Sequence, residues 1–137
     1  MSDNATVRTT ARLEVGPSLI HGRGVFAVDG ANTGDVVERC PVIVIPADER
    51  DAVEDSVLGH YCYEWVDGDG ALALGFGSLY NHSGDPNAEF DFDEAEGAVV
   101  IIARRDIDPG EEVTIRYWPE GETDHSWFEL ADAAPHF

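Results

Sequence analysis

Short apolar runs rich in Val, Ile and other strand-forming residues recur along most of the chain, and turns containing glycine separate them. Runs of this length and composition are typical of short β-strands. One stretch differs, because residues 47–57 combine Ala with several acids after Pro46 and predict a short exposed helix. Residues 59–74 predict a hairpin around a Gly-Asp-Gly turn. The other predicted strands are residues 13–15, 25–28, 35–38, 42–45, 97–103 and 112–117.

The pattern breaks in residues 75–90, which read GFGSLYNHSGDPNAEF. Polar, turn-forming side chains here lie beside Leu79 and Tyr80, in a chain that otherwise favours strands. The segment is either an elaborate turn or a binding surface built on backbone groups. With 137 residues, of which 43 % are hydrophobic, the chain is long enough for one core. We therefore expect a single, mostly β domain with little helix.

The start of the chain and its cysteines bear on where the protein works. The first twelve residues are polar where a signal peptide needs an apolar centre, and they predict a flexible lead-in to a cytoplasmic protein. No apolar run reaches the roughly 18 residues of a membrane span. Cys40 and Cys62 lack the close pairing of a zinc site, so we expect two buried, reduced thiols and no metal.

Charge is the strongest signal in the composition. The chain has 28 acids and 8 bases, a net charge of −20, and every base is an arginine. Such a chain should not bind nucleic acid directly, because that requires Lys and Arg against phosphate. The acids either adapt the protein to a salty cytoplasm or attract a basic partner protein, and both explanations can hold. Self-repulsion among them predicts a fold that salt stabilises.

Three separated pieces carry a family resemblance. They read HGRGVFA (residues 21–27), GFGSLYNHSGDPN (75–87) and GEEVTIRYW (110–118). In order, spacing and wording they resemble the SET-domain family of protein lysine methyltransferases, and above all its minimal viral and prokaryotic members. The likeness covers residues 13–118, so residues 1–12 would be a lead-in and residues 119–137 a flanking segment. A lone Gly-x-Gly is weak evidence, whereas three motifs in order are specific.

The resemblance implies both a fold and a cofactor. The fold is one of small curved β-sheets with a C-terminal pseudoknot, where the Asn-His-Ser segment lies beside the last strand. The cofactor is S-adenosyl-L-methionine, and the polar segment would form one wall of its pocket. Gly22, Arg23 and Gly24 would hold the methionine part, since residues without side chains let backbone approach a ligand. Asn81 and His82 would also contact the cofactor, although His82 could equally be a structural histidine.

Two tyrosines match catalytic positions in the family. Tyr117 would orient the lysine amine for an in-line methyl transfer, a reaction in which positioning should dominate. Tyr61 matches a tyrosine beside the lysine channel, although plain core packing is the alternative. Asn87 more readily fixes its turn than touches a ligand. Trp118 stands where the family usually has Gly, which leaves the channel exit and the number of methyl groups added open.

The flanking segment contains an aromatic pair at Trp127 and Phe128. By resemblance Trp127 would pack over the adenine, and a core or dimer contact is the alternative. The leading hypothesis is therefore a protein-lysine N-methyltransferase that acts on another, basic protein. The alternative is a catalytically inactive module with the same fold that docks a protein tail or the cofactor. The minimal relatives often pair, so a homodimer is also expected, whereas a metal enzyme using His21, His60 and His82 is not.

Overall fold

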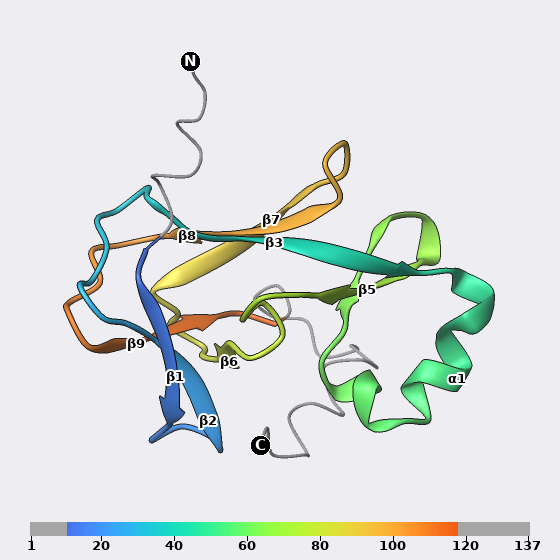
Figure 1. Ribbon diagram of the computed structural model, residues 1–137, viewed down its shortest axis with the longest axis horizontal. Helices are drawn as coiled ribbons and strands as arrows, with labels where there is room; N and C mark the ends of the chain where they lie inside the picture. Colours follow the sequence, from blue (N-terminus) through green and yellow to red (C-terminus); the bar gives the residue numbers. More distant parts are fainter. Residues whose placement is uncertain (1–10, 118–137) are drawn as a thin grey trace.

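The computed structural model describes residues 11–117, which form two curled β-sheets, with short helical turns between strands β3, β4 and β5 of one of them (Figure 1). The expectation of a mostly β fold with little helix is confirmed. The predicted boundaries after residues 12 and 118 fall next to the ends of the described range and stay predictions. None of the helices within residues 11–117 is long and apolar enough to cross a membrane.

The first sheet has four strands in the order β1-β2-β9-β6. Strand β2 pairs antiparallel with both β1 and β9, whereas β6 pairs parallel with β9. This parallel pair joins two segments that are about thirty residues apart in the sequence, which a simple hairpin cannot do. The strands are β1 (Leu13–Pro17), β2 (Arg23–Ala27), β6 (Asn81–His82) and β9 (Glu111–Ile115).

The second sheet has five antiparallel strands in the order β4-β5-β3-β8-β7. Its longest strand, β3, merges the two strands predicted on either side of Pro41. Pro41 has no N–H to give to a ladder, and it lies where β3 changes its partner from β8 to β5. The strands are β3 (Val36–Ile45), β4 (Tyr63–Glu64), β5 (Gly70–Ala73), β7 (Ala88–Asp93) and β8 (Ala98–Ala103).

The segment predicted as one helix is three short helical pieces. Only one turn of it is α-helical, and a 3₁₀ turn lies on either side. The second of these starts at Ser56, whose side chain accepts a hydrogen bond from the Leu58 N–H. A fourth helical turn connects β4 to β5 in place of the tight hairpin predicted there. The pieces are η2 (Ala47–Glu49), α1 (Arg50–Glu54), η3 (Val57–His60) and η4 (Val66–Gly68).

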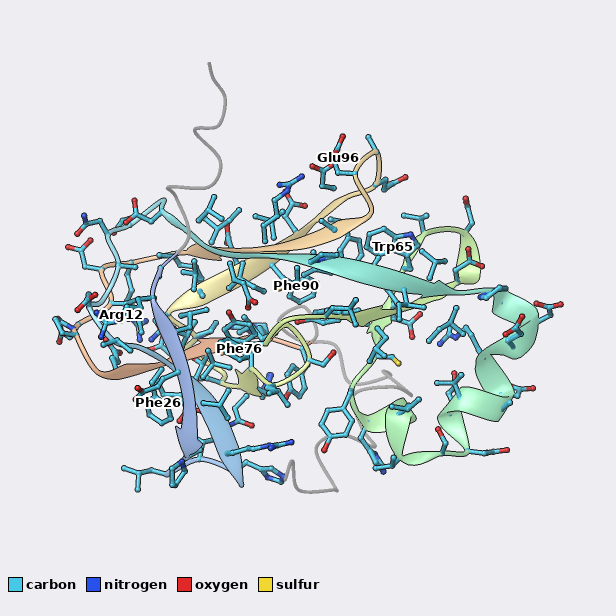
Figure 2. All side chains as sticks on the ribbon, viewed as in Figure 1. Arg12, Phe26, Trp65, Phe76, Phe90 and Glu96 are labelled. Atoms are coloured by element: carbon cyan, nitrogen blue, oxygen red, sulfur yellow. The ribbon has the colours of Figure 1, made fainter. Side chains whose placement is uncertain are left out.

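One core joins the two sheets. Val25, Val113 and Ile115 contribute from the first sheet and Val99 and Ile101 from the second, each at most 1 % exposed. Aromatic rings extend this core along β7, where Tyr63 packs edge-on against Phe90 at 5.1 Å and Trp65 packs on Phe92 at 4.7 Å between centroids. Figure 2 shows Phe90 and Phe76 inside the molecule, below β3. Both expected thiols, Cys40 and Cys62, are free and buried.

Candidate active site

The predicted motifs meet where β6 lies beside β9. Asn81 is paired with Thr114 and His82 with Ile115, and the Ser83 N–H donates to the Ile115 carbonyl at 2.9 Å. The expectation that the Asn-His-Ser segment lies beside the last strand is therefore confirmed. A strand of only two residues has too few ladder bonds to hold itself in place, so side chains must do so.

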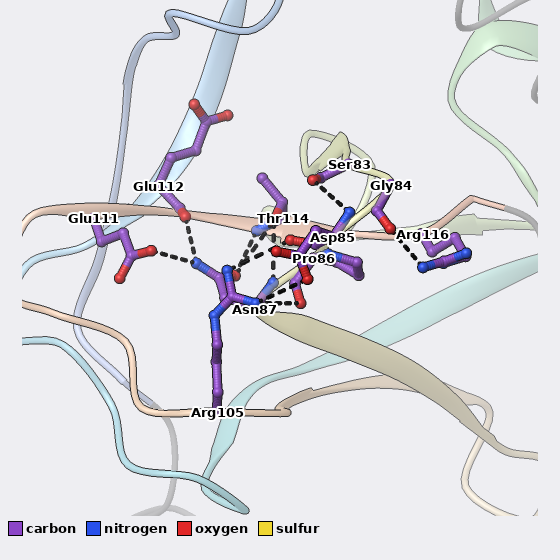
Figure 3. A network of polar contacts seen from close by, with 10 residues as sticks. All are labelled: Ser83, Gly84, Asp85, Pro86, Asn87, Arg105, Glu111, Glu112, Thr114 and Arg116. Atoms are coloured by element: carbon purple, nitrogen blue, oxygen red, sulfur yellow. Dashed lines mark hydrogen bonds and ion pairs between the residues drawn. The ribbon is translucent and has the colours of Figure 1, made fainter. Parts of the chain in front are cut away.

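Asn87 is one of these side chains (Figure 3). It is 2 % exposed, its Oδ1 accepts from the Thr114 N–H at 2.9 Å, and its Nδ2 donates to the Glu112 carbonyl at 2.8 Å. Arg105 adds to the same turn by donating to the Pro86 carbonyl at 3.4 Å. Asn87 thus fixes the turn against β9, which is the role expected for it from the sequence.

Asn81 connects three parts of the site. Its Nδ2 lies 3.0 Å from the Arg23 carbonyl, 3.1 Å from the His21 carbonyl and 2.8 Å from Glu112 Oε2. The other Glu112 oxygen accepts from the Ser18 hydroxyl at 2.7 Å. The buried amide and the carboxylate together tie the Gly-Arg-Gly loop to β6 and β9. Glu112 and Ser18 were not singled out from the sequence, since nothing local marks their pairing.

The Gly-Arg-Gly loop itself has two features of a ligand cradle. Gly22 has a φ of 51°, which favours glycine, whereas at Gly24 the side chains of Glu112 and Asn81 occupy the place that a Cβ would take. The Nε of Arg23 is buried and has no hydrogen-bond partner in the structure. An unpaired buried donor needs a partner, and an anionic group bound against the loop would provide one.

Tyr117 follows β9 and is 8 % exposed. Its hydroxyl donates to the Tyr80 carbonyl at 2.8 Å, and its backbone N–H donates to His82 Nδ1 at 3.0 Å. The His82 ring therefore helps to place Tyr117, which supports the structural role considered for it. With its proton directed at Tyr80, the Tyr117 hydroxyl has a fixed orientation.

Tyr61 and Tyr117 line one cavity. Both line a small cavity of about 10 Å³ together with His60, Tyr63, Gly77, Ser78 and Tyr80. Tyr63 and Trp65 also belong to the aromatic core along β7, and the Tyr63 hydroxyl donates to the Gly77 carbonyl at 2.7 Å. Tyr61 itself lies outside the sheet, since β4 begins only at Tyr63 and Tyr61 ends a helical turn.

The hydroxyl of Tyr80 is held by Glu38, a further residue that the sequence did not reveal. The Tyr80 hydroxyl donates to Glu38 Oε1 at 2.7 Å, and the Phe76 N–H donates to Glu38 Oε2 at 3.0 Å. Burial and then the nearby Glu38 charge raise the pKa of Tyr80 well above its usual value, so it remains a donor. This clamp on the loop fixes the carbonyl that accepts from Tyr117.

Three other expectations complete the site. Trp127 and Trp118 lie outside the described residues, so their roles stay predictions. Within residues 11–117 no cluster of three or more His, Cys, Asp or Glu side chains is arranged to hold a metal ion. His21, His60 and His82 are therefore not brought together, and His82 acts on Tyr117 instead.

Comparison with known proteins agrees with this geometry. The SET domain family model matches residues 22–118. The chain is 34 % identical over 118 residues to a histone-lysine N-methyltransferase of Schizosaccharomyces pombe specific for H3 lysine-37, covering 85 % of this chain and 77 % of that protein. It is 35 % identical over 117 residues to the histone-lysine N-methyltransferase TRX1 of Oryza sativa subsp. japonica, covering 77 % of this chain and 11 % of that protein.

A solved structure is similar as well. A candidate histone methyltransferase of Plasmodium falciparum superposes with a TM-score of 0.68 at 28 % identity, covering 82 % of this chain and 97 % of that one. The family model spans more than half of the chain, and the motifs that match it meet at one site. The chain belongs to the SET-domain family of protein-lysine methyltransferases.

Proposed function

We propose that this protein transfers a methyl group from S-adenosylmethionine to a lysine side chain of another, basic protein. The observation that carries the proposal is the meeting of Tyr117 and Tyr61 in one cavity, whose Tyr80 directly precedes the Asn81 that holds the Gly-Arg-Gly loop. The relatives named above act on histones, which are basic, and the net charge of −20 favours a basic partner.

The residues of the loop fit the cofactor. Gly22 has no side chain to keep a ligand from the backbone of the loop, and the unpaired Arg23 Nε suits the carboxylate of the cofactor's methionine part. The main chain of Asn81 and His82 would meet the adenine, and Trp127 would close over it. When bound, S-adenosylmethionine supplies an activated methyl group on a sulfonium sulfur.

Tyr117 has the right groups to position the substrate amine. Because its hydroxyl donates to the Tyr80 carbonyl, its oxygen is held in a fixed place at the cavity, where it would orient the amine for transfer. Tyr61 and Tyr63 line the cavity with aromatic surface, which suits the aliphatic stem of a lysine. Low polarity there also favours the neutral amine that must attack.

The substrate must be another protein, since the chain has no lysine of its own. The first test is calorimetric binding of S-adenosylmethionine in high salt to the wild type, Asn81→Ala, Tyr117→Phe and the control Asn32→Ala. We expect binding to be lost in Asn81→Ala alone. Tyr117→Phe should bind but methylate histone at least about 100-fold more slowly.

Each other outcome has a definite meaning. If the wild type binds no cofactor at any salt concentration, the methyltransferase proposal is wrong for this chain. If the wild type binds but transfers no methyl group to histone or to any protein of a lysate, the inactive binding module is correct instead. If Asn32→Ala, at an exposed turn, fails like Asn81→Ala, the effect is on folding and not on the pocket.

A further inference from the structure

A second, larger hollow lies against Tyr117. Its volume is about 260 Å³, and its apolar lining is formed by Pro86, Ala88, Phe90 and the ring of Tyr117 itself. The lining also includes three charged residues, Glu89, Arg104 and Arg116. Tyr117 also lines the small cavity with Tyr61, so the predicted lysine site and this hollow share one residue.

The pairing of the arginines makes this hollow unusual. Seven of the eight arginines fall within residues 11–117, and four of them form ion pairs: Arg12, Arg39, Arg50 and Arg105. Arg104 and Arg116 form none within the described range, although the chain has 28 acids. Arg116 instead donates to the Gly84 carbonyl at 2.6 Å (Figure 3). Two of the three remaining arginines therefore meet at one hollow.

We propose that Arg104 and Arg116 bind an anionic side chain, a carboxylate or a phosphate, which the substrate protein carries close to its target lysine. This inference rests on the proposed function. Guanidinium groups bind carboxylate and phosphate through a fork of donors, and the apolar floor would receive the carbon stem of the anionic residue. Acids elsewhere on the chain would repel the anion, whereas in this hollow two guanidinium charges stand against the single carboxylate of Glu89.

Two levels of recognition follow from the charges. The net charge of −20 selects a basic protein at long range, whereas the two arginines select a lysine with an acidic or phosphorylated neighbour at short range. Histone-like basicity alone would therefore not make a good substrate. The position of the anion relative to the lysine would decide which lysine is methylated.

The test is a set of lysine-centred peptides on a neutral background, each with one Glu, phosphoserine or Gln at a single position from four residues before the lysine to four after it. Methylation by the full chain is measured with labelled S-adenosylmethionine. We expect one or two positions where Glu or phosphoserine raises kcat/KM about ten-fold over Gln, an effect that shrinks as salt rises. A much larger effect of phosphoserine than of Glu would identify a phosphate as the natural ligand.

The variants separate this site from general charge. Arg104 is exposed, so Arg104→Gln should fold normally and lose the preference for Glu over Gln. Arg104→Glu should prefer an arginine at the same position. The control Arg12→Gln removes the same charge from an exposed ion pair with Asp29 and should keep the preference for Glu. Equal rates for Glu and Gln peptides at every position in the wild type would overturn the proposal.

A binding measurement covers the case where no peptide is methylated. Acetyl-glutamate methylamide or acetyl-phosphoserine methylamide is titrated into the labelled full chain, and amide shifts of Ala88 and Phe90 are followed. Saturable shifts that Arg104→Gln abolishes support the anion site even if the chain proves to be no methyltransferase. Methylation without an anion preference and without these shifts would leave the proposed function standing and refute the anion site.

Discussion

The two sheets are stabilised by different means, although they share one core. In the five-stranded sheet, long antiparallel ladders join β3, β8 and β7, and side chains such as Val99 and Ile101 are fully buried. In the four-stranded sheet, β6 has two residues, and the amides of Asn81 and Asn87 hold it by bonding backbone and carboxylate groups. Apolar packing thus builds the scaffold and polar contacts place the site.

The difference has a physical reason. A site must present backbone and small residues to its ligands, so it cannot cover them with apolar side chains. Buried amides fix such a backbone because each one needs particular donors and acceptors at particular places. Cores tolerate swaps that conserve volume, whereas a buried polar contact tolerates few changes of donor or acceptor. The two sheets should therefore respond differently to conservative substitutions.

The largest effect on stability is expected in the scaffold sheet. Ile101 is fully buried between the strands, so Ile101→Ala should lower the free energy of unfolding by about 3 kcal/mol through lost burial and a cavity. Ile101→Val, which keeps most of the volume, should lose only about 1 kcal/mol. Urea unfolding in high salt measures both. Equal losses in the two variants would contradict the view that volume decides stability in this sheet.

The next effect tests the polar sheet in the same way. Asn87→Ala leaves the Thr114 N–H and the Glu112 carbonyl unpaired and should cost about 2 kcal/mol. Asn87→Asp has the same shape, but it loses the donors and sets a charge beside Glu111, whose Oε2 is 3.2 Å from the amide. We expect Asp to be no better than Ala when unfolding is measured. A mild Asn87→Asp variant would show that shape, and not hydrogen bonding, holds this turn.

The scaffold and the site were predictable from the sequence to different degrees. Strands with strong apolar patterns could be predicted closely, since the strand expected at residues 97–103 is β8 at Ala98–Ala103. Strand β7 was missed because the polar segment before it drew the boundary too late, although Ala-Glu-Phe-Asp-Phe-Asp alternates clearly. The Asn-His-Ser and Gly-Arg-Gly pieces could be placed together only through the family resemblance, since no local pattern brings them there.

The residues that support the site are the ones that sequence could not reveal. Glu38 and Tyr80 are 42 positions apart and Glu112 and Ser18 are 94 apart, so their pairing depends on the complete fold. A glutamate in a strand looks like an exposed residue until the structure brings Tyr80 to it. The residues expected to bind cofactor or substrate lie in recognisable motifs, whereas the pairings that hold them in place join distant residues and leave no pattern in the sequence.

Tyr80 connects the two sheets and should give a smaller, pH-dependent effect. Tyr80→Phe removes the donor to Glu38 Oε1, while the Phe76 N–H still bonds the other oxygen, so the loss at pH 7 should be about 1 kcal/mol. The folded protein holds the pKa of Tyr80 above the unfolded value of 10.0. The contribution of Tyr80 to the free energy of unfolding is therefore complete below pH 10 and falls as pH rises further.

The variant without this hydroxyl should lose less stability in that alkaline range. Urea midpoints of the wild type and Tyr80→Phe should therefore converge above pH 10. Tyr63→Phe is the matched control, because burial raises the pKa of Tyr63 in the same direction but its hydroxyl bonds a carbonyl instead of a carboxylate. It should converge similarly while leaving the Glu38 clamp intact. A gap that stays constant up to pH 11 would contradict the assignment.

The smallest effect is expected where the chain passes between the sheets. Asp106, before β9, accepts from both the N–H and the hydroxyl of Thr33, before β3, each at 2.9 Å. These bonds, the backbone one first, hold the pKa of Asp106 below its ordinary value of 3.8. A lowered pKa contributes stability that is present above the unfolded pKa and is lost as pH falls below it.

Asp106→Asn should therefore narrow the difference in urea midpoint between pH 6 and pH 3. Asp29→Asn removes an equal charge at an exposed ion pair, so a similar change there would mean that general repulsion among the acids, and not this connection, sets the acid sensitivity.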